Sequence, residues 1–141
     1  MLYAHYNKGT GKYQLLSTHL DNVANQLNDH NRCIQFDGTI DEVFGRALTL
    51  LGYYHDIGKV MPEFQDYIRG DKSIGEDKNH ALISAVIFVI MCSGVLDEKI
   101  LYLSFLAILN HHKKMEAISD TKGYQWQSIG KKAKSVKNSL T

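Results

Sequence analysis

A chain of 141 residues can bury one sizeable core but is too short for two ordinary domains. With 44% apolar residues, one proline and no low-complexity tract, its composition excludes a disordered or fibrous protein and favours a single all-α domain over residues 1–141. The net charge of +1 is unevenly distributed along the sequence. Residues 113–141 contain seven lysines and two acidic residues, Glu116 and Asp120, and carry a charge of +5, which leaves residues 1–112 with a charge of −4.

Cysteine usage and hydropathy predict a soluble cytoplasmic protein with no membrane partner. Cys33 and Cys92 are not in a Cys-x-x-Cys pair, so a reducing compartment is expected. No apolar run follows a basic start, so no signal peptide is indicated. Residues 81–92 are apolar, but a membrane span needs about 20 such residues, and this run therefore predicts a buried core helix.

The first 11 residues predict a loop or arm because they contain closely spaced Gly and Thr residues that interrupt regular structure. His5 is accordingly interpreted as a loop histidine. From about Tyr13 to Asp29 the sequence predicts an amphipathic helix. Its apolar stripe comprises Leu16, Leu20, Val23 and Leu27. His19 borders this stripe, where a lone histidine is most often a packed core residue.

The pattern Thr39-x-x-Glu42 is a capping box and predicts a helix from Ile40 to about Asp56. Its buried face should comprise Val43, Ala47, Leu50, Leu51 and Tyr54. Gly58 is then expected to end the helix in a left-handed conformation.

Pro62 predicts a short helix to Ile68. Phe64 and Gln65 on this helix should point back to the core, either for packing and capping or for substrate contact. The polar stretch from Arg69 to Lys78 should be an exposed loop.

Two more helices are expected in the second half of the chain. His80 opens an apolar helix to about Cys92, and Asp97 or Glu98 begins the next. Ser104, Ala107, Ile108 and His111 share a face of this last helix. His112 lies about 100° from His111 around a helix. Both can therefore reach one site only if the helix ends there, or both can be ligands if two metal ions are bound. The alternative is that one of them is a surface histidine.

The pair His55-Asp56 joins an imidazole to a carboxylate, a ligand mixture that suits Mn²⁺, Fe²⁺, Ni²⁺ or Co²⁺. In isolation the pair could equally be a helix C-terminus with a favourably placed imidazole. Other segments, however, supply further imidazoles at His19, His80 and His111-His112.

These motifs resemble the HD superfamily of metal-dependent phosphohydrolases. The narrower resemblance is to the HD nuclease of type I CRISPR interference, which partners or is fused to a superfamily 2 helicase. It rests on His55-Asp56-Ile57-Gly58-Lys59, Phe64-Gln65, His80 and His111-His112. Ala4-His5 also resembles the opening of this family.

The resemblance implies an HD-domain helical bundle with two divalent ions in its core, drawn from Mn, Ni, Co, Fe and Mg. It implies a deoxyribonuclease that cuts single-stranded DNA together with a helicase and a guide-RNA complex. By motif, His19 and His55 with Asp56 would hold the first ion. Asp56 would bridge to a second ion held by His80, His111 and His112, and Lys59 would neutralise the scissile phosphate.

One departure from the family pattern concerns the end of the chain. The family usually supplies a further Asp well beyond the paired histidines, whereas here Glu116 and Asp120 are the only carboxylates there and both are too close. Either the chain is truncated at its C-terminus, or a shorter site is completed by water or a partner.

The last segment predicts a basic amphipathic helix. Its apolar positions are Trp126, Ile129, Ala133, Val136 and Leu140. Its cations, which could follow a phosphate backbone, are Lys131, Lys132, Lys134 and Lys137. The alternative is a docking helix with a solvated lysine face.

Two other functions use the same residues. One is an HD phosphohydrolase acting on nucleotides. The other is an incomplete, non-catalytic HD scaffold that binds nucleic acid or a partner protein.

Overall fold

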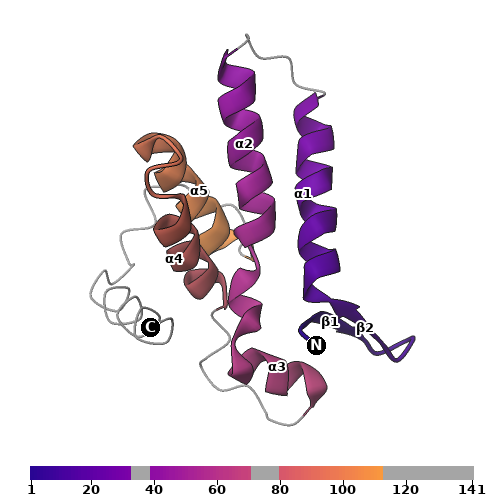
Figure 1. Cartoon of the computed structure of the whole chain (residues 1–141). Coiled ribbons are helices and arrows are strands. Elements are labelled where there is room, and N and C mark those ends of the chain that lie inside the picture. Colours follow the sequence, from indigo (N-terminus) through magenta and orange to yellow (C-terminus); the bar gives the residue numbers. More distant parts are fainter. Residues whose placement is uncertain (33–38, 71–79, 113–141) are drawn as a thin grey trace.

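The computed structural model describes residues 1–32, 39–70 and 80–112, and this part of the chain is mostly helical (Figure 1). Its elements in chain order are β1 Tyr3–Asn7, β2 Lys12–Leu15, α1 Leu16–Arg32, α2 Thr39–Tyr54, the 3₁₀ helix η1 Ile57–Val60, α3 Pro62–Arg69, α4 His80–Cys92 and α5 Glu98–Asn110. Within these ranges no helix is long and apolar enough to cross a membrane. The predicted basic helix and its lysines lie outside the described residues.

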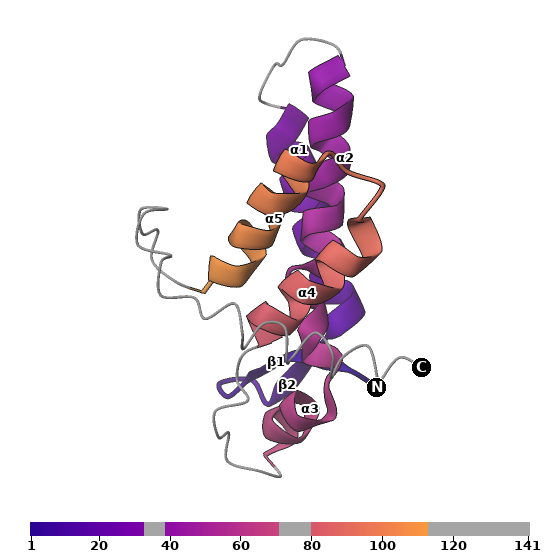
Figure 2. The same cartoon turned by 90° about the vertical axis from the view of Figure 1, so that its left-hand side faces the viewer.

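Helices α1 and α2 run antiparallel, side by side, and form the long axis of the molecule (Figures 1 and 2). Their close approach depends on small residues at the contact. Ala24 is 1% exposed, and a Cβ placed on Gly52 would lie 2.5 Å from the Ala24 Cα. A side chain at position 52 would therefore push the two helices apart.

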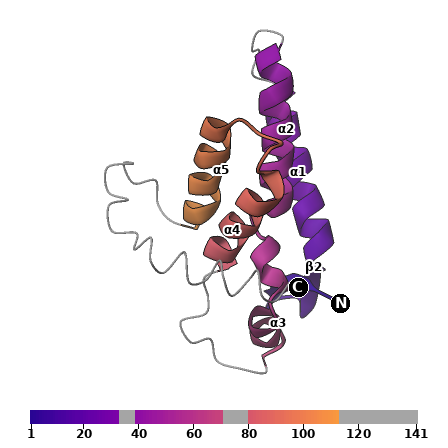
Figure 3. The same ribbon diagram turned by 60° about the vertical axis from the view of Figure 1, so that its left-hand side comes forward.

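The main core lies where α4 and α5 pack together and against α2 (Figure 3). Phe88 and Cys92 of α4 meet Ile108 of α5, and all three are at most 1% exposed. A smaller cluster joins Ala4 of β1 to Leu16 and Leu20 of α1. This second cluster fixes the β1–β2 hairpin to the lower end of α1.

The hairpin itself corrects the prediction of a loop over the first 11 residues and of an all-α chain. Strands β1 and β2 are antiparallel, and Tyr13 stacks between Tyr3 and Tyr6 with ring centroids 4.7 Å apart. The Asn7 side chain accepts hydrogen bonds from the backbone N–H groups of Gly9 and Thr10, which closes the turn. Helix α1 accordingly begins at Leu16, three residues later than predicted.

The later helices follow the predicted pattern. Helix α4 begins at His80, and the Asp97 carboxylate caps α5 by accepting a hydrogen bond from the Lys99 N–H at 2.9 Å. The prediction for Gly58 is wrong, because this residue lies inside η1 and is not in the left-handed conformation. Gly70, at the end of α3, does adopt it, with φ of 84°. The side chain of Thr39 in the predicted capping box lies outside the described part of the structure.

Replacing Gly52 with Ala should destabilise the protein by about 1–3 kcal/mol, because the added methyl meets the backbone of α1. Gly45→Ala, in the same helix, is the matched control: its Cβ meets only the end of the Asn31 side chain, at 3.3 Å, and alanine has the higher helix propensity. Urea unfolding of both variants measures the difference. Equal stability of the two variants would contradict the close α1–α2 contact.

Candidate metal centre

Four segments bring imidazole groups to one buried carboxylate at the lower end of the bundle. Asp56, 2% exposed, lies in the turn between α2 and η1. The start of α4 and the end of α5 face the same end of the bundle as the hairpin and α3 (Figures 2 and 3). The side chains around Asp56 are His19, His55, Lys59, His80 and His111.

The two oxygens of Asp56 face different groups of side chains. Oδ1 lies 3.1 Å from His80 Nε2 and 3.2 Å from His111 Nε2. Oδ2 lies 2.9 Å from His19 Nε2 and 3.4 Å from His55 Nε2. The carboxylate therefore stands between two separate sets of imidazoles, with one oxygen for each.

Backbone carbonyls orient two of these rings. His55 Nδ1 lies 2.7 Å from the Gly52 carbonyl oxygen, and His111 Nδ1 lies 2.6 Å from that of Ile108. A carbonyl oxygen only accepts, so each Nδ1 carries a hydrogen; Nε2 then donates to the carboxylate when the ring is protonated and can bind a cation when the ring is neutral. This arrangement is the usual way in which proteins present a histidine to a metal ion.

His112, a partly exposed residue, joins the Oδ1 side of the centre. Helix α5 ends at Asn110, so His111 and His112 lie beyond its regular turns, and the His80 and His112 Nε2 atoms are 2.8 Å apart. The ligand atoms of Asp56, His80, His111 and His112 all lie within 4.8 Å of one another. Both members of the pair thus reach one site because the helix is ending.

The pKa values of Asp56 and His112 are shifted toward the forms that bind metal, whereas burial lowers the pKa of His111 but its hydrogen bond to Asp56 raises it above the ordinary value. Burial raises the pKa of Asp56, but hydrogen bonds from the surrounding histidines more than offset this effect and hold its pKa well below the usual range. For His112, burial and the nearby His111 and His80 lower the pKa to about 4. Asp56 is therefore ionised and His112 neutral at pH 7. These are the forms that coordinate a cation.

Lys59 is more closely bound to Asp56 than the sequence suggested. Its side chain is 2% exposed, and Nζ lies 2.7 Å from Asp56 Oδ2. The ammonium group also lies 5.6 Å from the centroid of the Phe64 ring. In this structure its charge balances the buried carboxylate.

Gln65 proves to be a packing residue, buried to 3% exposure. Its amide oxygen accepts from the Tyr3 N–H, and its Nε2 donates to the carbonyl oxygens of Tyr3 and Lys59. Gln65 thus ties strand β1 to the segment that follows Asp56. Of the two roles left open for it, packing is the one that these contacts describe.

Gly58 sets the distance between Asp56 and α4. Its N–H donates to Ser84 Oγ at 2.8 Å, and a Cβ at this position would clash with the carbonyl oxygen of His80. The need for glycine here is therefore close approach rather than a left-handed turn. Because η1 can touch α4, Asp56 lies beside His80.

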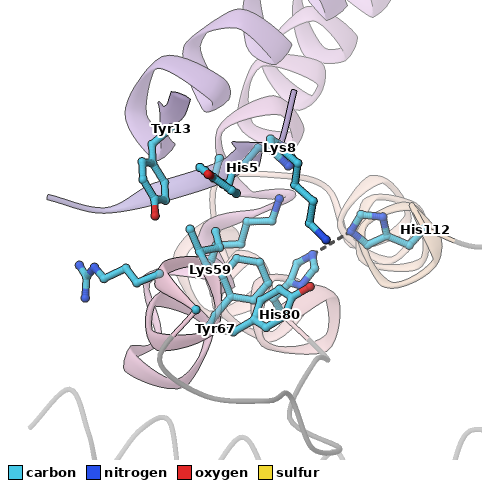
Figure 4. Close-up of a pocket in the computed structure, with 13 residues that line it drawn as sticks. His5, Lys8, Tyr13, Lys59, Tyr67, His80 and His112 are labelled. Carbon is cyan, nitrogen blue, oxygen red and sulfur yellow. Dashed lines mark hydrogen bonds between the residues drawn. The ribbon is translucent and has the colours of Figure 1, made fainter. Parts of the chain in front are cut away.

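A cavity of about 580 Å³ opens beside this centre (Figure 4). Its walls are the hairpin, α3 and the start of α4, and it reaches His80, His112 and Lys59. Lys8 and Arg69 add positive charge to the lining. The aromatic lining residues are Tyr6, Tyr13, Phe64 and Tyr67.

One residue near Asp56 was missed by sequence reasoning. His5, interpreted as a loop histidine, lies with His19 and Asp56 in a second group of potential ligands whose atoms are within 4.8 Å of one another. The only sequence signal for it was the Ala4-His5 pair. Its position depends on the hairpin, which was not predicted.

Comparisons of the chain with models of protein families, with curated proteins and with solved structures found no match.

Gly58→Ala should weaken metal binding at this centre, because the added methyl forces η1 away from α4 and separates Asp56 from His80. We expect a loss of about 1–3 kcal/mol in folding stability as well. Calorimetric titration with Mn²⁺ measures the first effect, and Gly45→Ala, remote from Asp56, is the control. Unchanged Mn²⁺ affinity in Gly58→Ala would show that the η1–α4 contact does not position the ligands.

Proposed function

We propose that this protein is a metal-dependent phosphodiesterase of the HD type that cleaves single-stranded DNA. The observation that carries the proposal is the placement of Asp56, whose two oxygens each face a separate set of imidazoles. A carboxylate can bridge two ions because it has two ligand oxygens, whereas a histidine offers one usable nitrogen.

The ligand assignment follows these two sides. His19 and His55 would hold one divalent ion with Asp56 Oδ2, and His80, His111 and His112 would hold the other with Oδ1. A set of imidazoles with a single carboxylate suits Mn²⁺, Fe²⁺, Co²⁺ or Ni²⁺ better than the all-oxygen sites typical of Mg²⁺. When bound, two such ions make a water molecule a stronger nucleophile and stabilise charge on the phosphate and the leaving oxygen.

Lys59 would lose its contact with Asp56 when metal ions are bound. The Lys59 ammonium group lies 2.7 Å from Asp56 Oδ2 and would be repelled by a divalent cation held there. Since Lys59 also lines the cavity, its charge can then compensate a phosphate bound there. Its role in the reaction is thus electrostatic stabilisation, separate from holding the ions.

The lining of the cavity supports an unpaired nucleic acid as substrate. Lys8 and Arg69 provide charges for phosphates, and the tyrosine and phenylalanine rings provide surfaces on which bases can stack. Bases offer both faces for such stacking only when they are not paired in a duplex. By resemblance, a helicase and a guide-RNA complex in the cytoplasm would supply the single strand.

A nucleotide phosphohydrolase is the second candidate, because a cavity of about 580 Å³ can also enclose a small ligand. The two candidates differ in the preferred substrate. With Mn²⁺ present, the nuclease should degrade circular single-stranded DNA and leave mononucleotides intact. Turnover of mononucleotides without cleavage of the circle would favour the phosphohydrolase.

Lys59→Ala should retain both ions but cleave single-stranded DNA about 10²–10³-fold more slowly, because only charge stabilisation is removed. Metal analysis and single-turnover cleavage test the two statements separately. Lys12→Ala, on the exposed face of the hairpin, should cleave as the wild type does. Loss of metal from Lys59→Ala would contradict the role assigned to this lysine.

Lys8→Gln should make binding of single-stranded DNA less dependent on salt. If Lys8 neutralises one phosphate, the slope of log affinity against log salt concentration should fall by about 0.7. Fluorescence anisotropy with the cleavage-deficient Asp56→Asn variant as background measures this slope. Lys12→Gln removes the same charge from the same hairpin outside the cavity, and an equal effect of the two substitutions would argue against DNA in the cavity.

A further inference from the structure

The two sides of Asp56 differ in the number of ligands assigned to them. On the Oδ1 side, Asp56 is joined by three histidines. On the Oδ2 side, His19 and His55 are the only histidines of the described residues within hydrogen-bonding distance of the oxygen, which makes three ligands with Asp56. First-row divalent ions take at least four ligands, so an ion on this side would take one more once it displaces the Lys59 ammonium group, which lies 2.7 Å from Oδ2.

His5 of strand β1 lies next to this incomplete side. Its ring centroid is 4.8 Å from that of His19, with the ring planes at 84°. A nitrogen of His5, a nitrogen of His19 and an oxygen of Asp56 lie within 4.8 Å of one another. Ligands of one tetrahedral ion, each about 2.0–2.2 Å from it, lie about 3.3–3.6 Å apart. The exposed His5 ring would therefore move toward Asp56 when an ion is bound.

The position of His5 is fixed by buried contacts of its strand. Ala4, 1% exposed, packs against α1, and the neighbouring Tyr3 exchanges two hydrogen bonds of 2.9 Å with Gln65. Gln65 also binds the Lys59 carbonyl oxygen at 2.7 Å, so the strand is held to the segment that follows Asp56. The pairing of β1 with β2 is irregular between Tyr3 and His5, a feature that commonly redirects a side chain beside a functional site.

We propose that His5 is the fourth protein ligand of the ion on the Oδ2 side. This inference rests on the proposed two-ion centre and gives both ions the same set of ligands, three histidines and the shared carboxylate. The hairpin would then be part of the metal centre as well as a wall of the cavity (Figure 4). Substrate entering the cavity would meet this ion directly, because His5 lies on the cavity wall.

The test is a calorimetric titration of the full chain with Mn²⁺, with metal analysis after gel filtration. The wild type should bind two ions. His5→Ala should keep one with unchanged affinity and bind the other at least about 10-fold more weakly, since even the loss of a residue that merely orients a ligand costs this much. His30→Ala is the matched control, because His30 is exposed on α1 and its Nδ1 bonds the Gln26 carbonyl oxygen, away from Asp56.

The outcomes separate this inference from the function on which it rests. Two ions bound with unchanged affinity by His5→Ala would overturn the role of His5 and leave the two-ion centre standing. If the wild type binds no ions, both the role of His5 and the proposed two-ion centre are wrong.

Rescue by free imidazole distinguishes a ligand from a residue that only shapes the hairpin. Added imidazole should restore the second ion in His5→Ala, because it can enter the exposed space that the side chain vacates. Added imidazole should leave Mn²⁺ binding by Lys12→Ala unchanged, because Lys12 lies in the same hairpin outside the cavity. A loss in His5→Ala that imidazole does not reverse would show that His5 supports the strand and does not bind the ion.

Discussion

The carboxylate of Asp56 is the group on which the rest of the structure depends. An ionised carboxylate that is 2% exposed is unfavourable unless cations or hydrogen-bond donors surround it. The surrounding groups come from α1, η1 and the ends of α4 and α5, so these elements must meet at one end of the bundle. Replacing Asp56 and its partners together by apolar residues would remove the cost of burying a charge and with it the donor set, which indicates that this arrangement serves binding more than stability.

Two glycines allow these elements to approach each other closely. Gly52 allows α1 to approach α2, and Gly58 allows η1 to touch α4. The first contact brings His19 toward Asp56, and the second brings His80 toward it. A helical bundle with ordinary spacing at either contact would separate the ligands beyond the reach of one ion.

Sequence reasoning could predict what depends on local pattern. The apolar run after His80 predicts one helix, and the polar residues Asp97 and Glu98 predict the start of the next. The structure contains both helices, α4 and α5. The hairpin was missed because its alternation covers only a few residues beside a Gly-rich turn. The role of Gly58 was misjudged because a left-handed turn and a close approach both require a missing Cβ. The placement of His5 depends on the long-range contact between its strand and Gln65, which cannot be predicted from a local sequence pattern.

The most direct test of the account is a crystal structure of the protein with Mn²⁺, with anomalous diffraction used to locate the ions. We expect two anomalous peaks flanking Asp56. One should lie beside Oδ1 with His80 and His111, and the other beside Oδ2 with His19 and His55. Peaks remote from Asp56, or none in crystals that contain Mn²⁺, would contradict the account.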